Sequence, residues 1–336
     1  MGPRELTWRA GPAVLLAAAV AAALLARRAR AGRDPSPGDR PPTVGDAEFL
    51  ADERYVQDGY RPAVVGGRRT RVFDRGEGEA VVFVPIIRGL EVVYARQLRA
   101  FAPTHRVLIY ERDEALEHPV PIAARVEEIR ALLDHLGIER AHVVGLGDAG
   151  VPALHFGRAH PDRALSLTSV NLGPRYRMKP YWLTEGVVNP LTVRLPVERF
   201  VPGWVIRSFV VGKTAGGGAL PKHLIRHMVD HIDEPVRVHK YSVMPVTSEH
   251  EMRDWAGTLR VPTLLIGRDD DPLAPVAELE ELAAMLPDCR GVHILPDGGR
   301  YLTYTWADRV AALLRAHFAA AGQAQERPMD DAPGLV

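Results

Sequence analysis

Three histidines recur at every fourth residue of the segment KHLIRHMVDHID: His223, His227 and His231. On a helix this spacing places them along one face, and two histidines four residues apart have the spacing of zinc ligands. No third ligand is evident nearby, so we expect neither a metal nor a cofactor here. Two interpretations stay open: the histidines form the polar flank of a helix, or one of them faces a pocket and acts as a base. The apolar residues of that helix, which would pack inward, are Leu224, Ile225, Met228 and Ile232.

A run of three acidic residues, Asp269, Asp270 and Asp271, is a second group that could do chemistry. Carboxylates are ligands for divalent cations, but successive residues of a chain point in different directions. We therefore interpret the run as a solvated turn and not as a metal site.

Three segments of the chain together resemble one known family. HVVGLGDAGVPALHFGRAHPDRALSL, from His142, is similar to the nucleophile elbow of the α/β-hydrolase fold. VPTLLIGRDDDPLAP, from Val261, resembles the strand and turn that carry the catalytic acid of that family, and LPDGGRYLTYTWADRVAALLRAHF, from Leu295, resembles the segment of its catalytic histidine. The resemblance implies an α/β-hydrolase fold: a mostly parallel twisted sheet flanked by helices, with a helical cap insertion.

The residues at the matched positions depart from the family's chemistry. The family's elbow reads G-x-S-x-G, and the nucleophile position here is Gly147, which has no side chain. The acid matches Asp271, whereas the position of the histidine is Arg300, which stays protonated in proteins and cannot act as a general base. The loop of residues 84–89 also lacks the family's His-Gly oxyanion signature. We therefore do not expect a standard Ser-His-Asp hydrolase.

Asp148 is the candidate for a displaced nucleophile, because epoxide hydrolases and haloalkane dehalogenases of this fold use an elbow aspartate. The register is one residue off, however, and would put Leu146 where a small residue is needed. The other interpretation is that Asp148 begins the following helix, where a carboxylate meets free N–H groups. Without a histidine to activate water, an attack by Asp148 would leave a stable ester.

The resemblance implies that Arg300 and Asp271 face each other, because the family holds its histidine and acid in contact. Either the two form a buried ion pair that replaces the lost dyad, or Arg300 presents its guanidinium to a carboxylate or phosphate of a ligand.

The candidate residues lie in a chain that alternates short apolar runs with longer amphipathic stretches. This alternation predicts a mostly parallel sheet covered by helices, and that sheet would position them. Residues 122–136 form the clearest predicted helix and end before Gly137. The strands are predicted at residues 69–74, 80–84, 106–110, 141–145, 165–171, 263–266 and 291–295.

The composition of the 336-residue chain supports one large globular unit. It has 46% hydrophobic and 25% charged residues, which excludes disorder over the whole length. Lys plus Arg is 42 and Asp plus Glu is 42, so the chain lacks the basic excess of a nucleic-acid binder. Its single cysteine, Cys289, excludes an internal disulfide framework.

Composition shifts along the chain predict its organisation. Residues 1–33 form an N-terminal hydrophobic segment, and residues 34–45 form a Pro- and Gly-rich linker. The α/β-hydrolase domain spans residues 46–322, with a cap insertion at 173–257 that breaks the strand–helix rhythm. Residues 323–336 are polar and form a flexible tail.

The hydrophobic segment allows three interpretations. Residues 11–26 carry no charge, but a helix of that length spans only about 24 Å of a hydrocarbon core of ~30 Å. It is a single-pass anchor, a cleaved signal peptide with an Ala29-Arg30-Ala31 site, or a soluble leader helix. We favour the anchor, and the arginines that follow it then place the main domain in the cytoplasm. The expected localisation is therefore membrane-associated and single-pass.

The function expected from these observations is that of a degenerate member of the fold. It would use the pocket between sheet and cap to bind an apolar small molecule, with or without a carboxylate, or to catalyse an elimination, cyclisation or rearrangement. The alternatives are an ester or epoxide hydrolase built on Asp148 and a cap histidine, and a membrane-tethered scaffold without activity.

Overall fold

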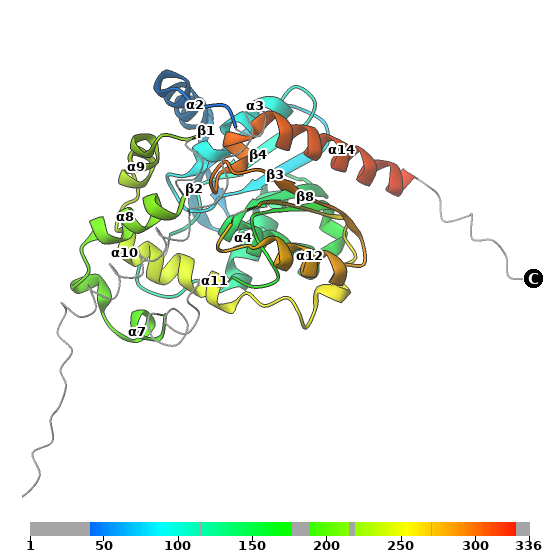
Figure 1. Cartoon of the computed structure of the whole chain (residues 1–336). Coiled ribbons are helices and arrows are strands. Elements are labelled where there is room, and N and C mark those ends of the chain that lie inside the picture. The colour runs from blue at the N-terminus through cyan, green and yellow to red at the C-terminus, as the bar shows by residue number, and fades with distance from the viewer. Residues whose placement is uncertain (1–40, 115, 177–188, 215–218, 270, 327–336) are drawn as a thin grey trace, which may run out of the picture.

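An eight-stranded sheet forms the centre of the molecule (Figure 1). The computed structural model describes residues 41–114, 116–176, 189–214, 219–269 and 271–326. The strand order is β1-β2-β4-β3-β5-β6-β7-β8; β1 and β2 run antiparallel to their neighbours, and the other pairs are parallel. The strands are β1 (Tyr60–Val65), β2 (Arg68–Arg75), β3 (Ala80–Val84), β4 (Arg106–Tyr110), β5 (Ala141–Leu146), β6 (Ala164–Val170), β7 (Thr263–Arg268) and β8 (Cys289–Leu295).

All seven predicted strands are confirmed, and β1 is the strand that was not predicted. The central strands β3, β5 and β6 are buried at every position, as expected for a parallel sheet with both faces covered. By contrast, β1 lies at the edge, is largely exposed and contains Pro62, which cannot donate to a ladder. Its sequence therefore lacks the apolar run by which the others are recognised.

Helices cover both faces of the sheet. Helices α3 and α14 pack against each other, while α4 and α5 form another packed pair and α12 lies against β7 and β8. The predicted helix at residues 122–136 is α4, which ends one residue earlier and is followed by Gly137 at a φ of 64°. The α-helices outside the β6–β7 segment are α2 (Asp46–Gly59), α3 (Ala95–Phe101), α4 (Ile122–His135), α5 (Gly150–Ala159), α12 (Val276–Met285), α13 (Leu302–Thr305) and α14 (Ala307–Glu326) in the described part of the chain.

A group of short helices between β6 and β7 lies to one side of the sheet (Figure 1). It falls within the predicted cap span, although residues 177–188 and 215–218 of that span lie outside the described part of the chain. The domain boundaries themselves stay predictions. The helices of this cap are α7 (Asn189–Arg194), α8 (Gly203–Thr214), α9 (Lys222–Asp230), α10 (Pro235–Val238), the π-helix η7 (His239–Val243) and α11 (Met244–Glu249).

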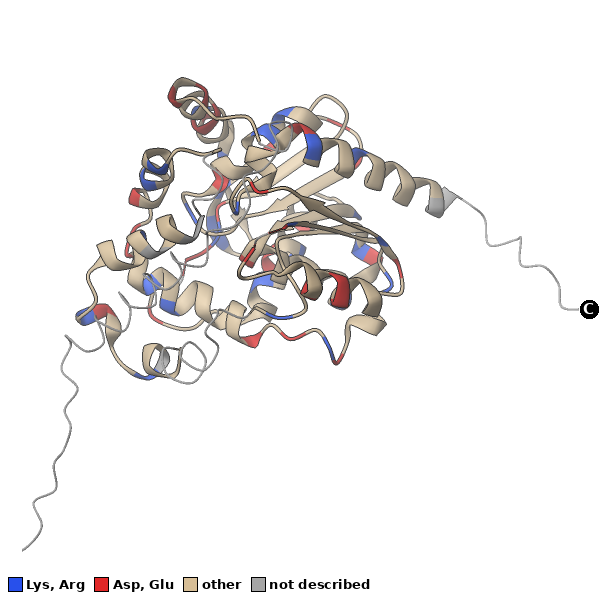
Figure 2. Cartoon of the chain, viewed as in Figure 1, with Lys and Arg blue, Asp and Glu red and all other residues tan. Residues whose placement is uncertain are grey.

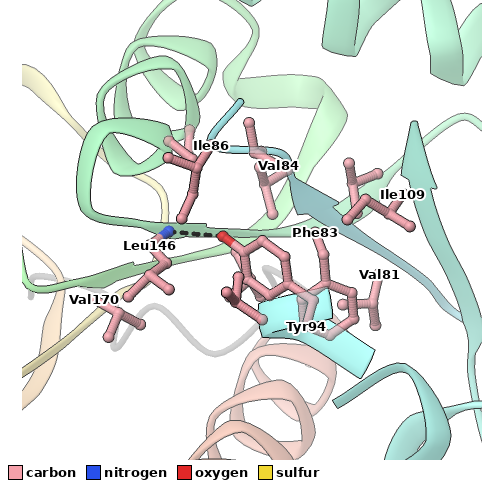
Figure 3. Close-up of a cluster of buried hydrophobic side chains, with 14 of the residues drawn as sticks. Val81, Phe83, Val84, Ile86, Tyr94, Ile109, Leu146 and Val170 are labelled. Carbon is pink, nitrogen blue, oxygen red and sulfur yellow. Dashed lines mark hydrogen bonds between the residues drawn. The ribbon is translucent and has the colours of Figure 1, made fainter. Parts of the chain in front are cut away.

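Tyr94 is part of the buried cluster of side chains beside β3 and β5 (Figure 3). Tyr94 is fully buried in the short helix η2 (Glu91–Tyr94), and its ring lies 5.4 Å from that of Phe83. Its hydroxyl accepts a hydrogen bond of 2.9 Å from the backbone N–H of Leu146. The last residue of β5 is thereby held by both packing and a buried hydrogen bond.

The expected single-pass membrane localisation must be corrected. Within the described residues, no helix combines the length and the apolar character needed to cross a membrane. Residues 11–26, on which the expectation was based, lie outside that part of the chain. Basic and acidic positions occur both on the helices that cover the sheet and on the cap (Figure 2), in keeping with a formal net charge of zero.

Candidate functional site

The turn from β5 into α5 has the geometry that the elbow resemblance predicts. Gly147 begins the short helix η3 (Gly147–Ala149) at a φ of 55°, a left-handed conformation that side chains rarely adopt. Two positions earlier, a Cβ on Gly145 would lie 2.3 Å from the carbonyl oxygen of Ala149. The sharp turn therefore requires the absence of a side chain at Gly145, and the predicted placement of Gly147 is confirmed.

The space above Gly147 is occupied by the guanidinium of Arg300. A Cβ added to Gly147 would lie 2.9 Å from Nη2 of Arg300. Arg300 follows two glycines with positive φ, Gly298 and Gly299, and is 8% exposed. Its carbonyl accepts a 3.0 Å hydrogen bond from the side chain of Asn171 at the end of β6. The arginine is thus fixed at the carboxyl edge of the sheet.

Asp271 lies between two arginines. Its Oδ1 is 3.6 Å from Nη1 of Arg300, and its Oδ2 is 3.5 Å from Nε of Arg268, the last residue of β7. The backbone N–H of Leu273 also donates to Oδ1, at 2.8 Å. Burial opposes the charge of Asp271, but the two arginines hold its pKa below the usual value. The predicted proximity of Arg300 and Asp271 is confirmed.

The cationic state of Arg300 is also favoured by its surroundings. Burial opposes the charge of the guanidinium, but the nearby carboxylates of Asp271 and Asp148 favour it, and the pKa of Arg300 lies above the usual value. The Tyr176 ring lies 5.8 Å from Cζ of Arg300. Burial likewise raises the pKa of Tyr176, so this phenol stays neutral. The site therefore holds a permanent cation and no base at position 300.

Asp148 lies beside this arginine and lines the same cavity. The predicted capping role is not found, since the described residues show no side-chain capping hydrogen bond at η3 or α5. Oδ1 of Asp148 is buried and has no hydrogen-bond partner among the residues that the structure describes. Asp148 is therefore a cavity-lining carboxylate, one oxygen of which has no protein partner among these residues.

The cavity between sheet and cap has a volume of about 160 Å³. Its sheet side carries the polar groups of Asp148 and Arg300, whereas the cap contributes mostly apolar side chains. The π-helix η7 also places His239 in the wall. The apolar residues from the cap are Ile206, Val210, Val229, Ile232, Pro235, Val238, Val243 and Met244.

The loop after β3 forms another part of the wall through Ile86, Ile87 and Leu90. Its N–H groups at Arg88 and Gly89 donate to carboxylates, at 3.0 Å to Glu114 and at 2.8 Å to Glu91. Burial raises the pKa of Glu91 to about 7.

His223 and His227 lie on α9 and His231 directly follows its last residue, and the apolar partners of the repeat are buried as predicted. The histidines, however, contact helix α2. His223 lies 2.8 Å from Asp46, and His227 lies 3.2 Å from Glu53. The hypothesis that one of them supplies a base to the pocket is therefore wrong, because the helix presents its other face to the cavity.

The described residues of the acidic run 269–271 differ in their surroundings. Asp269 is exposed and accepts a 3.2 Å hydrogen bond from the backbone of Asp297, Asp270 lies outside the described residues, and Asp271 is buried. The interpretation as a solvated turn holds for Asp269 but not for Asp271.

Four residues near the site were not found from the sequence: Arg268, Tyr176, His239 and Asn171. An arginine that ends an otherwise apolar strand was a usable signal for Arg268. The other three are brought in by the chain's path and by the cap, for which no local pattern exists.

The chain is similar in sequence to curated proteins that are named as hydrolases. The chain is 26% identical over 266 residues to a putative carbamate hydrolase RutD of Caulobacter sp. (strain K31), covering 74% of this chain and 91% of that protein. It is 24% identical to a 2-hydroxy-6-oxononadienedioate/2-hydroxy-6-oxononatrienedioate hydrolase of Comamonas testosteroni, covering 71% and 87%. No family model matches the chain.

Solved structures share the arrangement of strands and helices. A thermophilic esterase from Thermogutta terrifontis superposes with a TM-score of 0.63 at 19% identity, covering 78% of this chain and 98% of that one. The enol-lactonase from Burkholderia xenovorans LB400 gives 0.60 at 20% identity, covering 77% and 100%. At this identity the likeness concerns the fold.

Proposed function

The chain belongs to the α/β-hydrolase fold superfamily, and from this premise we propose that it binds an apolar small molecule carrying a carboxylate in the cavity between sheet and cap. In this proposal it does not hydrolyse by the Ser-His-Asp route. Any reaction it promotes is a non-hydrolytic elimination, cyclisation or rearrangement that depends on positioning and electrostatics.

The observation that carries the proposal is the guanidinium of Arg300 above Gly147. A nucleophile's attack needs a side chain at position 147 and a proton acceptor near it, and a glycine and an arginine offer neither. The arginine instead supplies a fixed positive charge with several donors. Asp271 offsets part of that charge, and a ligand carboxylate can engage the donors that remain.

The walls of the cavity indicate the rest of the ligand. Most of the lining side chains are aliphatic, so an elongated or branched hydrocarbon body is favoured over a sugar or a nucleotide. The carboxylate would lie at the sheet edge beside Arg300, and the body would point toward the cap.

Binding of matched ligands tests the proposal. We expect medium-chain and aryl-alkyl carboxylates to bind at least about 10-fold more tightly than the primary amides of the same chain, as measured by isothermal titration calorimetry. The difference corresponds to a charge-assisted hydrogen bond of roughly 1.4 kcal/mol or more. Arg300→Met should abolish the preference. Equal affinity of acid and amide for the unaltered protein would overturn the proposal.

Restoration of the family's residues tests the hydrolytic part. Gly147→Ser alone should give no turnover of p-nitrophenyl esters, because Arg300 cannot accept the serine proton. The matched variant is Gly147→Ser with Arg300→His, which supplies both groups beside Asp271. Turnover by the single variant would show that another base serves the site.

One observation favours a second candidate, a hydrolase that uses Asp148. The buried Oδ1 of Asp148 lacks a hydrogen-bond partner among the described residues, and His239 lines the same cavity. Attack by the carboxylate on an epoxide would open the ring to a hydroxyalkyl ester of Asp148, and attack on an aryl ester would expel the phenolate and leave a mixed anhydride; water must then cleave either adduct. Intact-mass analysis after incubation with aryl esters and epoxides distinguishes the two candidates. The first proposal expects no adduct on the unaltered protein or on Asp148→Asn, whereas the second expects an adduct on the unaltered protein alone.

A further inference from the structure

We propose a binding site for a divalent transition metal between helices α2 and α9, formed by Glu53, His227 and His231. The site lies on the surface of the cap, away from Gly147 and Arg300, and does not depend on the proposed function. It draws its third ligand from far along the chain, since Glu53 lies 174 residues before His227. That distance explains why no third ligand was found near the histidine repeat in the sequence.

The donor atoms converge on one point. Nε2 of His227 lies 3.2 Å from Oε2 of Glu53, and Nδ1 of His231 lies 3.8 Å from Oε1. The three candidate ligand atoms all fall within 4.8 Å of one another. Tetrahedral Zn²⁺ with ligand bonds of about 2.0–2.1 Å separates its donors by about 3.3 Å, so a small side-chain adjustment suffices.

Both helices that carry the ligands are held in place. On α2, Asp52 accepts hydrogen bonds from Arg96 and Arg99 of α3, at 3.1 and 3.2 Å, and from the Tyr304 hydroxyl at 2.9 Å. On α9, the apolar face is buried against the core. The preorganised backbone reduces the ordering cost of binding a metal.

The ligand types select the class of metal. Two imidazoles and one carboxylate suit Zn²⁺, Co²⁺ or Ni²⁺, whereas Mg²⁺ and Ca²⁺ prefer oxygen ligands alone. The side chains of Glu53, His227 and His231 are 21%, 38% and 53% exposed. Solvent can therefore reach the site and supply the fourth ligand.

The same helix provides an internal control. One turn earlier, His223 lies 2.8 Å from Asp46 of α2, also as a histidine facing a carboxylate. That pair has a similar separation and a similar surface setting, but no third donor joins it within the part of the chain that the structure describes. If the contacts were only ion pairs between helices, the two turns would respond alike to metal and to substitution.

Occupation of the site would affect the cavity through α9. Val229 of this helix and Ile232 just beyond it line the cavity on the side opposite the histidines. A metal that links α9 to α2 would therefore fix one wall of the cap relative to the sheet.

Zinc titration of the full-length protein after treatment with EDTA tests the site. We expect one Zn²⁺ per chain, with affinity about 10-fold or more weaker in His231→Ala and in Glu53→Gln, because even loss of an outer partner of a metal ligand costs 10–100-fold. The matched controls His223→Ala and Asp46→Asn should stay within about twofold of the unaltered protein.

Thermal unfolding supplies a second readout. Saturating Zn²⁺ should raise the melting temperature of the unaltered protein and of His223→Ala, but not that of His231→Ala, because only a ligand that binds the folded state stabilises it. Melting without metal shows that each variant folds. Absence of stoichiometric Zn²⁺ uptake would overturn the proposal, and so would equal losses in His223→Ala and His231→Ala, which would assign binding to exposed histidines in general.

Discussion

The two ends of the parallel strands bury ionisable groups in opposite states. At the carboxyl ends, Asp271 and Arg300 are both charged and lie 3.6 Å apart. Near the amino ends, His142 of β5 is buried and hydrogen-bonded to Ser166 of β6 at 2.8 Å. Burial lowers its pKa to about 3, so this histidine is neutral. His317 of α14 is similar, with a pKa lowered to about 4 by burial.

This difference shows that the fold readily accommodates a buried neutral imidazole. The chain thus has a buried neutral imidazole near the amino ends of its strands and a permanent cation at the cavity beyond their carboxyl ends. The comparison also predicts which change affects stability at each end. Lowering the pH should destabilise the protein through the histidines near the amino ends, and removing a charged side chain should destabilise it at the carboxyl ends.

The largest effect is expected for Arg300→Ala. Removing one partner of a buried ion pair leaves Asp271 with only Arg268 nearby, and such changes typically lower the free energy of unfolding by about 3–5 kcal/mol. Urea denaturation at pH 7 measures the loss. The matched control is Arg309→Ala on the exposed face of α14, which should cost less than about 0.5 kcal/mol. A loss below about 1 kcal/mol for Arg300→Ala would mean that Arg268 alone balances Asp271.

The next effect separates the two ends by pH. The pKa of His142 is about 3 in the folded state and ordinary, near 6.5, in the unfolded state, so the unfolded chain binds more protons and stability falls as pH drops below 6.5. Between pH 6.5 and 4.5 this amounts to about 2–3 kcal/mol at ~1.4 kcal/mol per pH unit. Asp271, with its lowered pKa, contributes stability that is retained down to about pH 4.

His142→Gln should therefore flatten the acid limb of the stability curve by that amount, measured as urea midpoints from pH 7 to pH 4.5. Exposed His223→Gln serves as the control and should leave the limb unchanged. If the urea midpoints of the unaltered protein and of His142→Gln fell in parallel from pH 7 to pH 4.5, His142 would take up a proton as easily in the folded protein as in the unfolded chain, which would contradict the prediction.

A smaller effect is expected for Gly147→Ala. A left-handed φ costs a non-glycine residue about 1–2 kcal/mol, and the new Cβ would press against Nη2 of Arg300. In an Arg300→Met background the contact should ease, so that a double-mutant cycle yields a coupling energy. Strict additivity of the two changes would indicate that Arg300 moves aside at no cost.

The smallest effect concerns Tyr94→Phe, which removes the acceptor for the Leu146 N–H. An unsatisfied buried donor should lower the free energy of unfolding by about 1 kcal/mol. The matched control is Tyr241→Phe in the cap, whose hydroxyl lies 3.4 Å from Glu198 in a half-buried setting. If both variants lost the same free energy of unfolding, the hydrogen bond between the Leu146 N–H and Tyr94 would stabilise the fold no more than the half-buried one.

Much of the sheet could be predicted because its strands are local apolar runs, and the turn at Gly147 because small residues flank it. The proximity of Arg300 to Asp271 could be predicted from the resemblance to the α/β-hydrolase fold, in which the residues at these two positions are in contact. By contrast, Glu53 gains its histidine partners from the packing of elements that are distant in the sequence, and no local pattern reports such packing. The cap resisted prediction for the same reason, since His239 reaches the cavity only through the π-helix.

The close approach between a side chain at position 147 and the arginine at position 300 has a consequence for the search for altered variants. The two positions are distant in sequence yet share one small volume, so the effect of a change at either depends on the residue at the other. Serine introduced at position 147 alone would be crowded by an arginine that cannot accept its proton. Histidine introduced at position 300 alone would be an imidazole with no hydroxyl to activate. Mutational libraries should therefore vary both codons together, because single-site scans pass only through unrewarded intermediates.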